Sequence, residues 1–115
     1  MKVLVLGGSS LLGSYFLREF HGHFDCGAIQ RRSFVTLDPK LANVPVYETK
    51  DLPSPEFLQE KIKDHDYVIN FISEGRVDFC EKNPEISNKL NYEFPIAVAY
   101  LCSKLQKDIV VFLLM

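Results

Sequence analysis

The chain opens with Met-Lys-Val-Leu-Val-Leu-Gly-Gly-Ser-Ser-Leu-Leu-Gly, residues 1–13, and this stretch decides the fold. An uninterrupted apolar run, residues 3–6, follows Lys2, which is typical of a strand buried in a parallel sheet. Gly7 breaks this run, and Gly13 stands within the start of an apolar helical pattern. A strand, a glycine turn and a helix N-terminus bind pyrophosphate, because the turn lets the backbone approach and the helix end offers unpaired N–H groups. The sequence therefore predicts a dinucleotide site at this turn.

The glycine spacing departs from a common pattern at one position. One form of the dinucleotide motif reads Gly-x-x-Gly-x-x-Gly, and the three slots here hold Gly7, Ser10 and Gly13. The serine adds a Cβ where backbone and phosphate approach each other, so it is expected to weaken binding. A glycine-rich turn without a ligand is the alternative interpretation, and the spacing alone leaves both open.

Length and composition limit the class of protein. A chain of 115 residues is at most one domain, and it is short for a dinucleotide enzyme that also carries a substrate site. The net charge of −2 argues for neither nucleic acid nor a disordered acidic tail. Cys26, Cys80 and Cys102 lack Cys-x-x-Cys spacing, which favours reduced thiols in a cytoplasmic protein over disulfides or a metal site. No targeting segment or membrane span is expected, since the apolar run 109–115 is far too short.

Strand-like and helix-like segments alternate along the chain. Strands are expected at 2–6, 25–30, 44–47, 67–72 and 109–114, and helices at 10–21, 54–64 and 84–106. The apolar stripe of the first helix falls on Leu12, Phe16 and Phe20. That of the last helix falls on Ile86, Leu90, Phe94, Ala97, Leu101 and Leu105. Pro95 lacks an N–H donor and predicts a kink in this helix. The alternation is typical of a parallel α/β sheet.

The end of the second strand bears on the choice of cofactor. A carboxylate about 20 residues past the glycine turn would bind the ribose hydroxyls of NAD. This chain instead has Gln30, Arg31 and Arg32, and its next carboxylate is Asp38. Guanidinium groups bind the 2′-phosphate of NADP through charge-assisted hydrogen bonds, so the pair favours NADP over NAD. The alternative is that the two arginines belong to a solvated turn.

Asp51 follows the third expected strand. Its carboxylate is suited to accept a hydrogen bond from an adenine amino group, or the residue simply begins a proline-rich turn.

Three later motifs are more specific than the glycine turn. They are Asp66-Tyr-Val-Ile-Asn-Phe-Ile-Ser73, Val77-Asp-x-x-Glu-x-Asn-Pro-Glu85 and Asn91-x-x-x-Pro95. In this order they resemble the dTDP-4-dehydrorhamnose reductase family of the extended short-chain dehydrogenase/reductase superfamily, whose members read V-I-N-A-A-A, V-D-x-x-E, P-E and N-x-x-x-P. The chain is also similar to the regulatory β subunit of methionine adenosyltransferase, which shares the Arg-Arg pair. The resemblance covers the N-terminal part of a family member.

The resemblance and the alternation together predict a Rossmann-type parallel sheet in the order 3-2-1-4-5, with helices on both faces and incomplete at the C-terminus. Residues 1–115 would be an NAD(P)-binding domain without the substrate-binding lobe. The implied cofactor site comprises Gly7, Ser10, Leu11, Leu12 and Gly13 at the pyrophosphate, Arg31 and Arg32 at the 2′-phosphate, Asp51 and Leu52 at adenine, Phe71, Ile72 and Ser73 at the nicotinamide-side ribose, and Asn91 beneath the cofactor. Phe71 and Ile72 replace alanines of the family, and either crowd the cofactor or pack in the core.

The catalytic residues implied by the family have no counterpart in this sequence. Members use a Ser or Thr after the strand expected at 109–114, then a downstream Tyr-x-x-x-Lys whose tyrosine protonates the carbonyl while NADPH delivers hydride. Tyr100-Leu-Cys-Ser-Lys104 spells this motif but precedes that strand, so no catalytic residue is assigned and the chain alone is expected to be inactive.

Three functions remain open. The chain is the NADP-binding portion of a dTDP-4-dehydrorhamnose reductase-like sugar-nucleotide reductase, a non-catalytic NADP-binding regulatory module, or a ligand-free incomplete domain. The strand at 109–114 would have an unpaired outer edge, which predicts a longer chain, a protein partner or oligomer that completes the sheet, or poor solubility.

Overall fold

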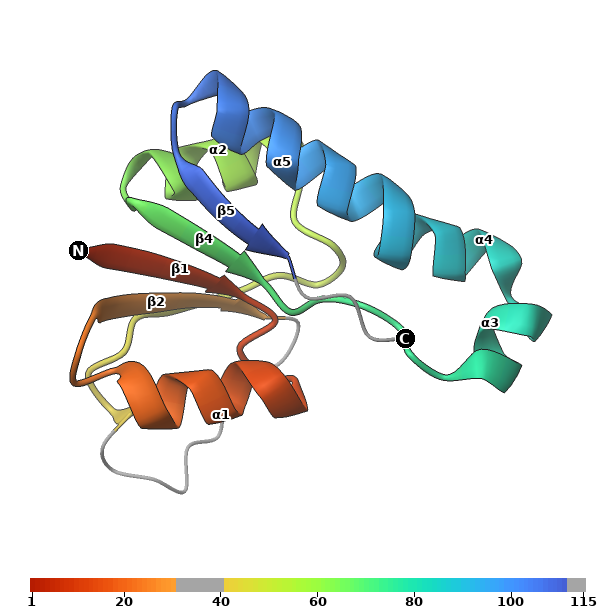
Figure 1. Ribbon diagram of the computed structural model, residues 1–115, viewed down its shortest axis with the longest axis horizontal. Coiled ribbons are helices and arrows are strands. Elements are labelled where there is room, and N and C mark those ends of the chain that lie inside the picture. The colour runs from red at the N-terminus through yellow and green to blue at the C-terminus, as the bar shows by residue number, and fades with distance from the viewer. Residues whose placement is uncertain (31–40, 112–115) are drawn as a thin grey trace.

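The computed structural model describes residues 1–30 and 41–111. Its strands are β1 (Lys2–Leu6), β2 (Asp25–Gln30), β3 (Val46–Glu48), β4 (Tyr67–Asn70) and β5 (Asp108–Val111). They form one sheet in the order β3-β2-β1-β4-β5, in which all four neighbouring pairs are parallel (Figure 1). The predicted Rossmann-type topology is therefore confirmed.

Helices cover both faces of the sheet, as predicted. Helix α1 (Leu11–Phe20) lies on one face, and α2 (Pro55–Lys63) and α5 (Phe94–Lys104) lie on the other (Figure 1). Strand β1 contributes side chains to the buried clusters on both faces of the sheet, because successive side chains of a strand point to opposite faces. Its Val3 and Val5 belong to the buried cluster on the α1 side, and its Leu4 and Leu6 belong to the cluster under α2 and α5.

The buried face of α1 differs from the predicted stripe. Leu12 and Phe20 are each 39 % exposed, whereas Gly13 and Leu17 are buried against the sheet. The cause is close packing: Gly13 has no Cβ, so the helix approaches the glycine turn at that residue and turns Leu17 into the core. The predicted stripe was right at Phe16, which packs partly buried against the core cluster, and wrong at Leu12 and Phe20.

The long helix predicted at 84–106 is interrupted by a π-helical turn. It consists of α4 (Pro84–Asn88), the π-helical turn η2 (Lys89–Glu93) and α5. The N–H of Phe94 donates to the carbonyl of Lys89, five residues back, and Pro95 follows at once with no N–H to donate. The irregularity predicted at Pro95 thus takes the form of a wider turn, and such turns are frequent at functional sites.

The buried face of the helix that follows agrees with the predicted stripe in part. The buried residues of α5 are Phe94, Val98, Leu101 and Cys102. Ala97, which the regular stripe placed in the core, is exposed. Phe94 and Leu101 are buried as predicted, and Leu105 packs against the core cluster. The predicted stripe was therefore wrong at Ala97, after the π-helical turn, and at Ile86, which is 47 % exposed before it.

Other boundaries moved by short distances. The first two predicted helices lose one residue at each end, and the third predicted strand begins two residues later. Helix α3 (Val77–Lys82) was not predicted. Strand β4 ends at Asn70 and not at Ile72, because the Oδ1 of Asn70 accepts the N–H of Ile72 at 3.0 Å and bends the chain out of the sheet. Strand β5 reaches Val111, and residues 112–114 of the last predicted strand lie outside the described part.

Candidate functional site

The candidate site lies at the carboxyl edge of the sheet. All described strand pairs are parallel, so the segments that follow β1, β3 and β4 leave this same edge, toward which the arrows point in Figure 1. The glycine turn comes after β1, and the segment 71–76 comes after β4. In open α/β sheets, ligands bind at this edge where the strand order reverses, which here is between β1 and β4.

The glycine turn has a shape that only glycine permits at two positions. Gly7 has φ of +85°, and its N–H donates to the carbonyl of Ile29 at 2.8 Å. A Cβ on Gly13 would overlap the carbonyl oxygen of Gly7. A Cβ on Gly7 would lie 3.1 Å from the Cγ1 of Ile72, so the turn also touches the segment after β4. The two glycines therefore bring α1, β1 and this segment together.

Ser10 is the N-cap of α1, and its side chain turns inward. Its Oγ donates to the carbonyl of Gly7 at 2.7 Å and accepts from the N–H of Gly13 at 3.0 Å. The serine thus occupies one helix N–H, and the first two N–H groups, those of Leu11 and Leu12, have no acceptor within the helix. A cradle for an anion at this helix end would consist of these two backbone groups.

The residues after β4 divide between core and edge. Phe71 is 7 % exposed, and its ring centroid lies 6.0 Å from that of Phe16 on the α1 side. Phe71 is therefore a core residue, in line with the packing alternative. Ile72 lies beside Gly7 and packs against the cluster under α2 and α5.

Two buried polar atoms, one at the end of β4 and one in the segment after it, have no hydrogen-bond partner among the described residues. They are the Nδ2 of Asn70, a residue only 1 % exposed, and the Oγ of Ser73. Such groups cost free energy when unpaired and call for an explanation in each structure. A polar ligand at the carboxyl edge fits both atoms. Ser73 is among the predicted cofactor residues and Asn70 is not, although a polar residue that ends an apolar strand was a usable signal.

Asn91 holds the segment after β4 from the π-helical turn. Its Oδ1 accepts the N–H of Glu74 at 2.7 Å, and its Nδ2 donates to the carbonyl of Glu74 at 2.8 Å. The carboxylate of Glu74 pairs with Arg76, with 2.6 Å from Nε to Oε1, and these hydrogen bonds lower the pKa of Glu74. Asn91 thus contacts the segment itself, and its expected effect on a ligand is through that segment.

Replacing Asn91 by alanine should release this segment. The change leaves the N–H of Glu74 without its partner and the carbonyl of Glu74 with only the thiol of Cys80, at 3.5 Å, so stability should fall by about 1–3 kcal/mol. Chemical denaturation measures this loss, and amide exchange should accelerate at Glu74. Asn88→Ala is the matched control, because Asn88 is exposed one turn earlier and should change stability by less than about 0.5 kcal/mol. Equal stability of the two variants would contradict the assignment.

The remaining predicted residues are less informative. Asp51 is exposed after β3, and its carbonyl accepts the hydroxyl of Thr49 at 2.7 Å. Leu52 packs against the core cluster under α2 and α5. Arg31 and Arg32 lie outside the described residues.

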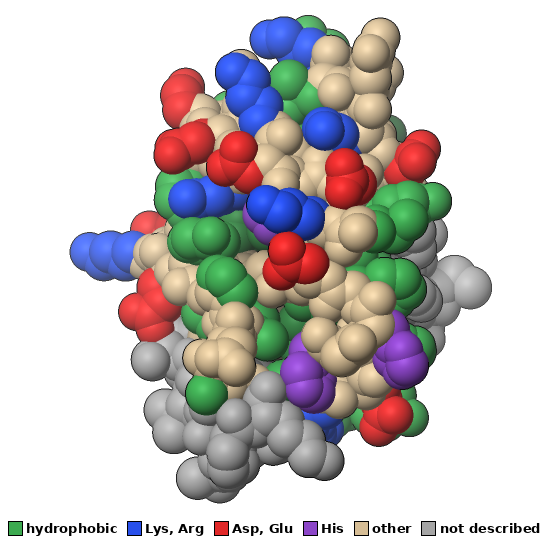
Figure 2. Space-filling model, turned by 90° about the vertical axis from the view of Figure 1, so that its left-hand side faces the viewer, with side chains coloured by type: hydrophobic (Ala, Val, Ile, Leu, Met, Phe, Trp, Pro, Cys, Tyr) green, Lys and Arg blue, Asp and Glu red, His purple; other side chains and the backbone are tan. Residues whose placement is uncertain are grey.

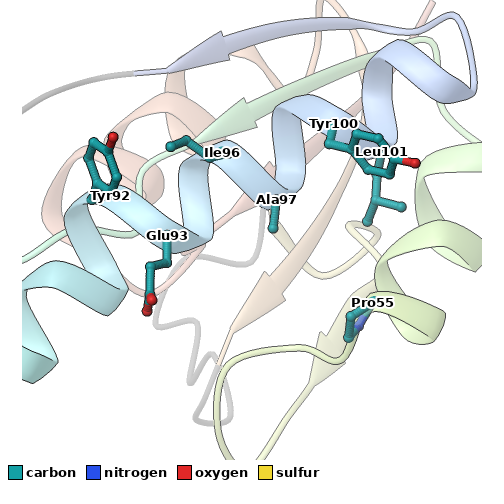
Figure 3. A pocket seen from close by; sticks show the side chains of 7 residues that line it. All are labelled: Pro55, Tyr92, Glu93, Ile96, Ala97, Tyr100 and Leu101. Atoms are coloured by element: carbon teal, nitrogen blue, oxygen red, sulfur yellow. The ribbon is translucent and has the colours of Figure 1, made fainter.

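A groove elsewhere does not involve the predicted cofactor residues. It has a volume of about 590 Å³ and runs between the start of α2 and the outer side of α5, where Pro55 faces the helix (Figure 3). Its lining includes Tyr92, Ile96 and Tyr100, which are all more than half exposed. Tyr100 therefore lies on the outer side of α5, apart from the glycine turn, and nothing in this geometry makes it a catalytic residue.

Other chemical groups give no second site among the described residues. Burial raises the pKa of the Cys26 and Cys102 thiols to about 11, which keeps them protonated at neutral pH. Residues 1–30 and 41–111 contain no cluster of three metal-ligating side chains and no helix long and apolar enough to cross a membrane. On the face in Figure 2, basic and acidic side chains are interspersed, so this face presents no surface of a single charge.

The sheet order and the glycine turn define a Rossmann-type α/β protein. Residues 1–112 match the family described as RmlD substrate binding domain, and the chain belongs to this family. A curated relative, the probable low-salt glycan biosynthesis reductase Agl14 of Haloferax volcanii, is 34 % identical over 104 residues. That alignment covers 89 % of this chain and 33 % of the relative, so the chain spans about a third of the relative's length.

Solved structures share the fold. A hypothetical dTDP-4-dehydrorhamnose reductase from Sulfolobus tokodaii is 23 % identical with a TM-score of 0.78, and the match covers 96 % of this chain and 38 % of that one. UDP-glucose 4-epimerase from Thermus thermophilus, solved in complex with NAD, is 16 % identical with a TM-score of 0.77, covering 92 % of this chain and 35 % of that one. At these identities the likeness concerns the fold.

Proposed function

We propose that this chain is the NADP-binding portion of a dTDP-4-dehydrorhamnose reductase-like sugar-nucleotide reductase. The observation that carries the proposal is the glycine turn at the carboxyl edge. Gly7 and Gly13 stand there at positions with no room for a side chain, and α1 begins at the same turn. Membership of the RmlD family supports the same function. The proposal covers the nucleotide-binding part alone, since the chain spans about a third of the reductase it matches.

Each part of the cofactor has proposed contacts. The N–H groups of Leu11 and Leu12 at the capped helix end would take the pyrophosphate. Asp51 and Leu52 would lie at adenine, and Ser73 would offer its buried hydroxyl to the ribose on the nicotinamide side. When bound, the nicotinamide ring supplies a hydride for reduction of a carbonyl. We assign no proton donor in this chain, and the outer edge of β5 is a proposed place for a further strand or a partner.

Titration with NADPH and NADH tests the proposal. The full chain should bind NADPH more tightly than NADH, because the 2′-phosphate adds charge-assisted contacts with Arg31 and Arg32. Calorimetry measures both affinities, and the fluorescence of the reduced nicotinamide gives a second readout. Absence of binding by either dinucleotide at millimolar concentration would refute the proposal and favour a ligand-free domain.

A further inference from the structure

The side chain of Asn70 stands where the glycine turn meets the segment after β4. Its Oδ1 accepts the N–H of Ile72 at 3.0 Å, so the carboxamide folds forward toward the carboxyl edge. The same backbone nitrogen of Ile72 lies 3.3 Å from the position that a Cβ on Gly7 would take. The carboxamide of Asn70 is therefore a neighbour of the Gly7 turn, although its Cα belongs to the sheet.

The nitrogen of this carboxamide, Nδ2, is a hydrogen-bond donor without an acceptor. Nδ2 is buried and has no hydrogen-bond partner among the described residues, while Asn70 as a whole is 1 % exposed. A buried amide donor without a partner is destabilising, and native proteins rarely retain one. The amide oxygen has a structural role, since leucine or valine at this position would leave the N–H of Ile72 without its acceptor. The amide nitrogen has no such role within the described residues.

We propose that Asn70 is a positioning and binding residue whose Nδ2 donates a hydrogen bond to an oxygen of the bound dinucleotide beside the Gly7 turn. This inference rests on the proposed function and adds to it a contact outside the predicted set of cofactor residues. One carboxamide then does two things at once. Its oxygen fixes the backbone of Ile72 against the turn, and its nitrogen recognises a ribose or pyrophosphate oxygen placed there.

The variant Asn70→Asp separates the two roles. A carboxylate keeps an acceptor for the N–H of Ile72 but replaces the donor with a second acceptor, which repels a ligand oxygen. A protonated carboxyl group has one O–H donor and so imitates the amide. The variant should bind NADPH at least about tenfold more weakly than the wild type near pH 8, and the gap should narrow near pH 5, where a buried carboxyl gains a proton.

Controls separate this effect from titration of the ligand and from loss of structure. The wild type, measured at both pH values, accounts for protonation of the cofactor phosphates. Asn88→Asp adds the same carboxyl to an exposed position and should follow the wild type. If Asn70→Asp does not fold, the side-chain amide resonances of Asn70 in the labelled wild type should shift when NADPH is added.

The outcomes are distinct. The proposed role of Asn70 is overturned if Asn70→Asp binds NADPH with the same affinity as the wild type at both pH values. It is also overturned if the side-chain amide resonances of Asn70 do not shift when NADPH is added. Either result leaves the proposed function intact. A wild type that binds no nicotinamide dinucleotide overturns both. A pH-dependent loss in Asn70→Asp alone supports the contact.

Discussion

Replacing Gly13 by alanine should destabilise the protein by an amount near the upper end of the range for overpacked cores, about 3 kcal/mol. The added methyl group would overlap the carbonyl oxygen of Gly7 and lie 2.9 Å from the Oγ of Ser10. Backbone cannot move aside as a flexible side chain does, so α1 must shift away from β1. The thermal midpoint should fall by roughly 10–20 °C in a domain of this size, as measured by circular dichroism.

The control is Gly22→Ala, at the end of the same helix. No atom of residues 1–30 or 41–111 lies within 4 Å of a Cβ built on Gly22, so this variant should stay within about 0.5 kcal/mol of the wild type. A second readout follows from the geometry: the cap formed by Ser10 opens when α1 shifts, and any nucleotide affinity should drop with it. A Gly13→Ala protein as stable as Gly22→Ala would mean that α1 and β1 are not as closely packed as described here.

The order of the strands was predictable because it depends on features that a sequence displays directly. Apolar runs such as residues 3–6 mark strands buried on both sides, and glycines at the turn mark the crossover into α1. The alternation of these segments with helices leaves few topologies, and the motifs around Asn70 and Asn91 select one of them.

The packing of the helices was not predictable in the same way. The stripe predicted for α1 was wrong at Leu12 because the helix comes closest to the glycine turn at Gly13, a residue that a count of apolar side chains leaves out. The stripe of the last helix was wrong at Ile86 and Ala97, which lie on either side of a π-helical turn that no regular spacing contains. Both errors come from backbone geometry and not from hydrophobicity.

The contacts of the predicted site residues with a cofactor stay a prediction, and the structure adds what some of these side chains do within the protein. The resemblance named Asn91 as lying beneath the cofactor, whereas its side chain holds both backbone groups of Glu74. Asn70 was not among the predicted residues, although a polar residue that ends an apolar strand was a signal, and its unpaired Nδ2 is visible only in the folded structure. Ser10 was expected to weaken binding through its Cβ, and the structure adds that its Oγ occupies the N–H of Gly13.

Replacing Arg31 and Arg32 together by alanine should abolish the preference for NADPH over NADH. Each charge-assisted contact with the 2′-phosphate contributes roughly 1.5–3 kcal/mol, so the affinity for NADPH should fall by one to two orders of magnitude per contact. The affinity for NADH should stay nearly constant, because NADH has no phosphate at that position. Calorimetric titration of both cofactors into both proteins measures the four constants.

The control must remove the same charge from another part of the molecule. Lys63 and Lys104 are exposed in the last turns of α2 and α5, so their double alanine variant loses two positive charges away from the glycine turn. It should keep the NADPH preference, with at most a small loss that disappears in high salt, because distant exposed charges are screened. A preference for NADPH that survives in the arginine variant would assign the 2′-phosphate to other residues. Equal affinities in the wild type would instead show that the arginine pair is a solvated turn and that the chain does not discriminate between the two cofactors.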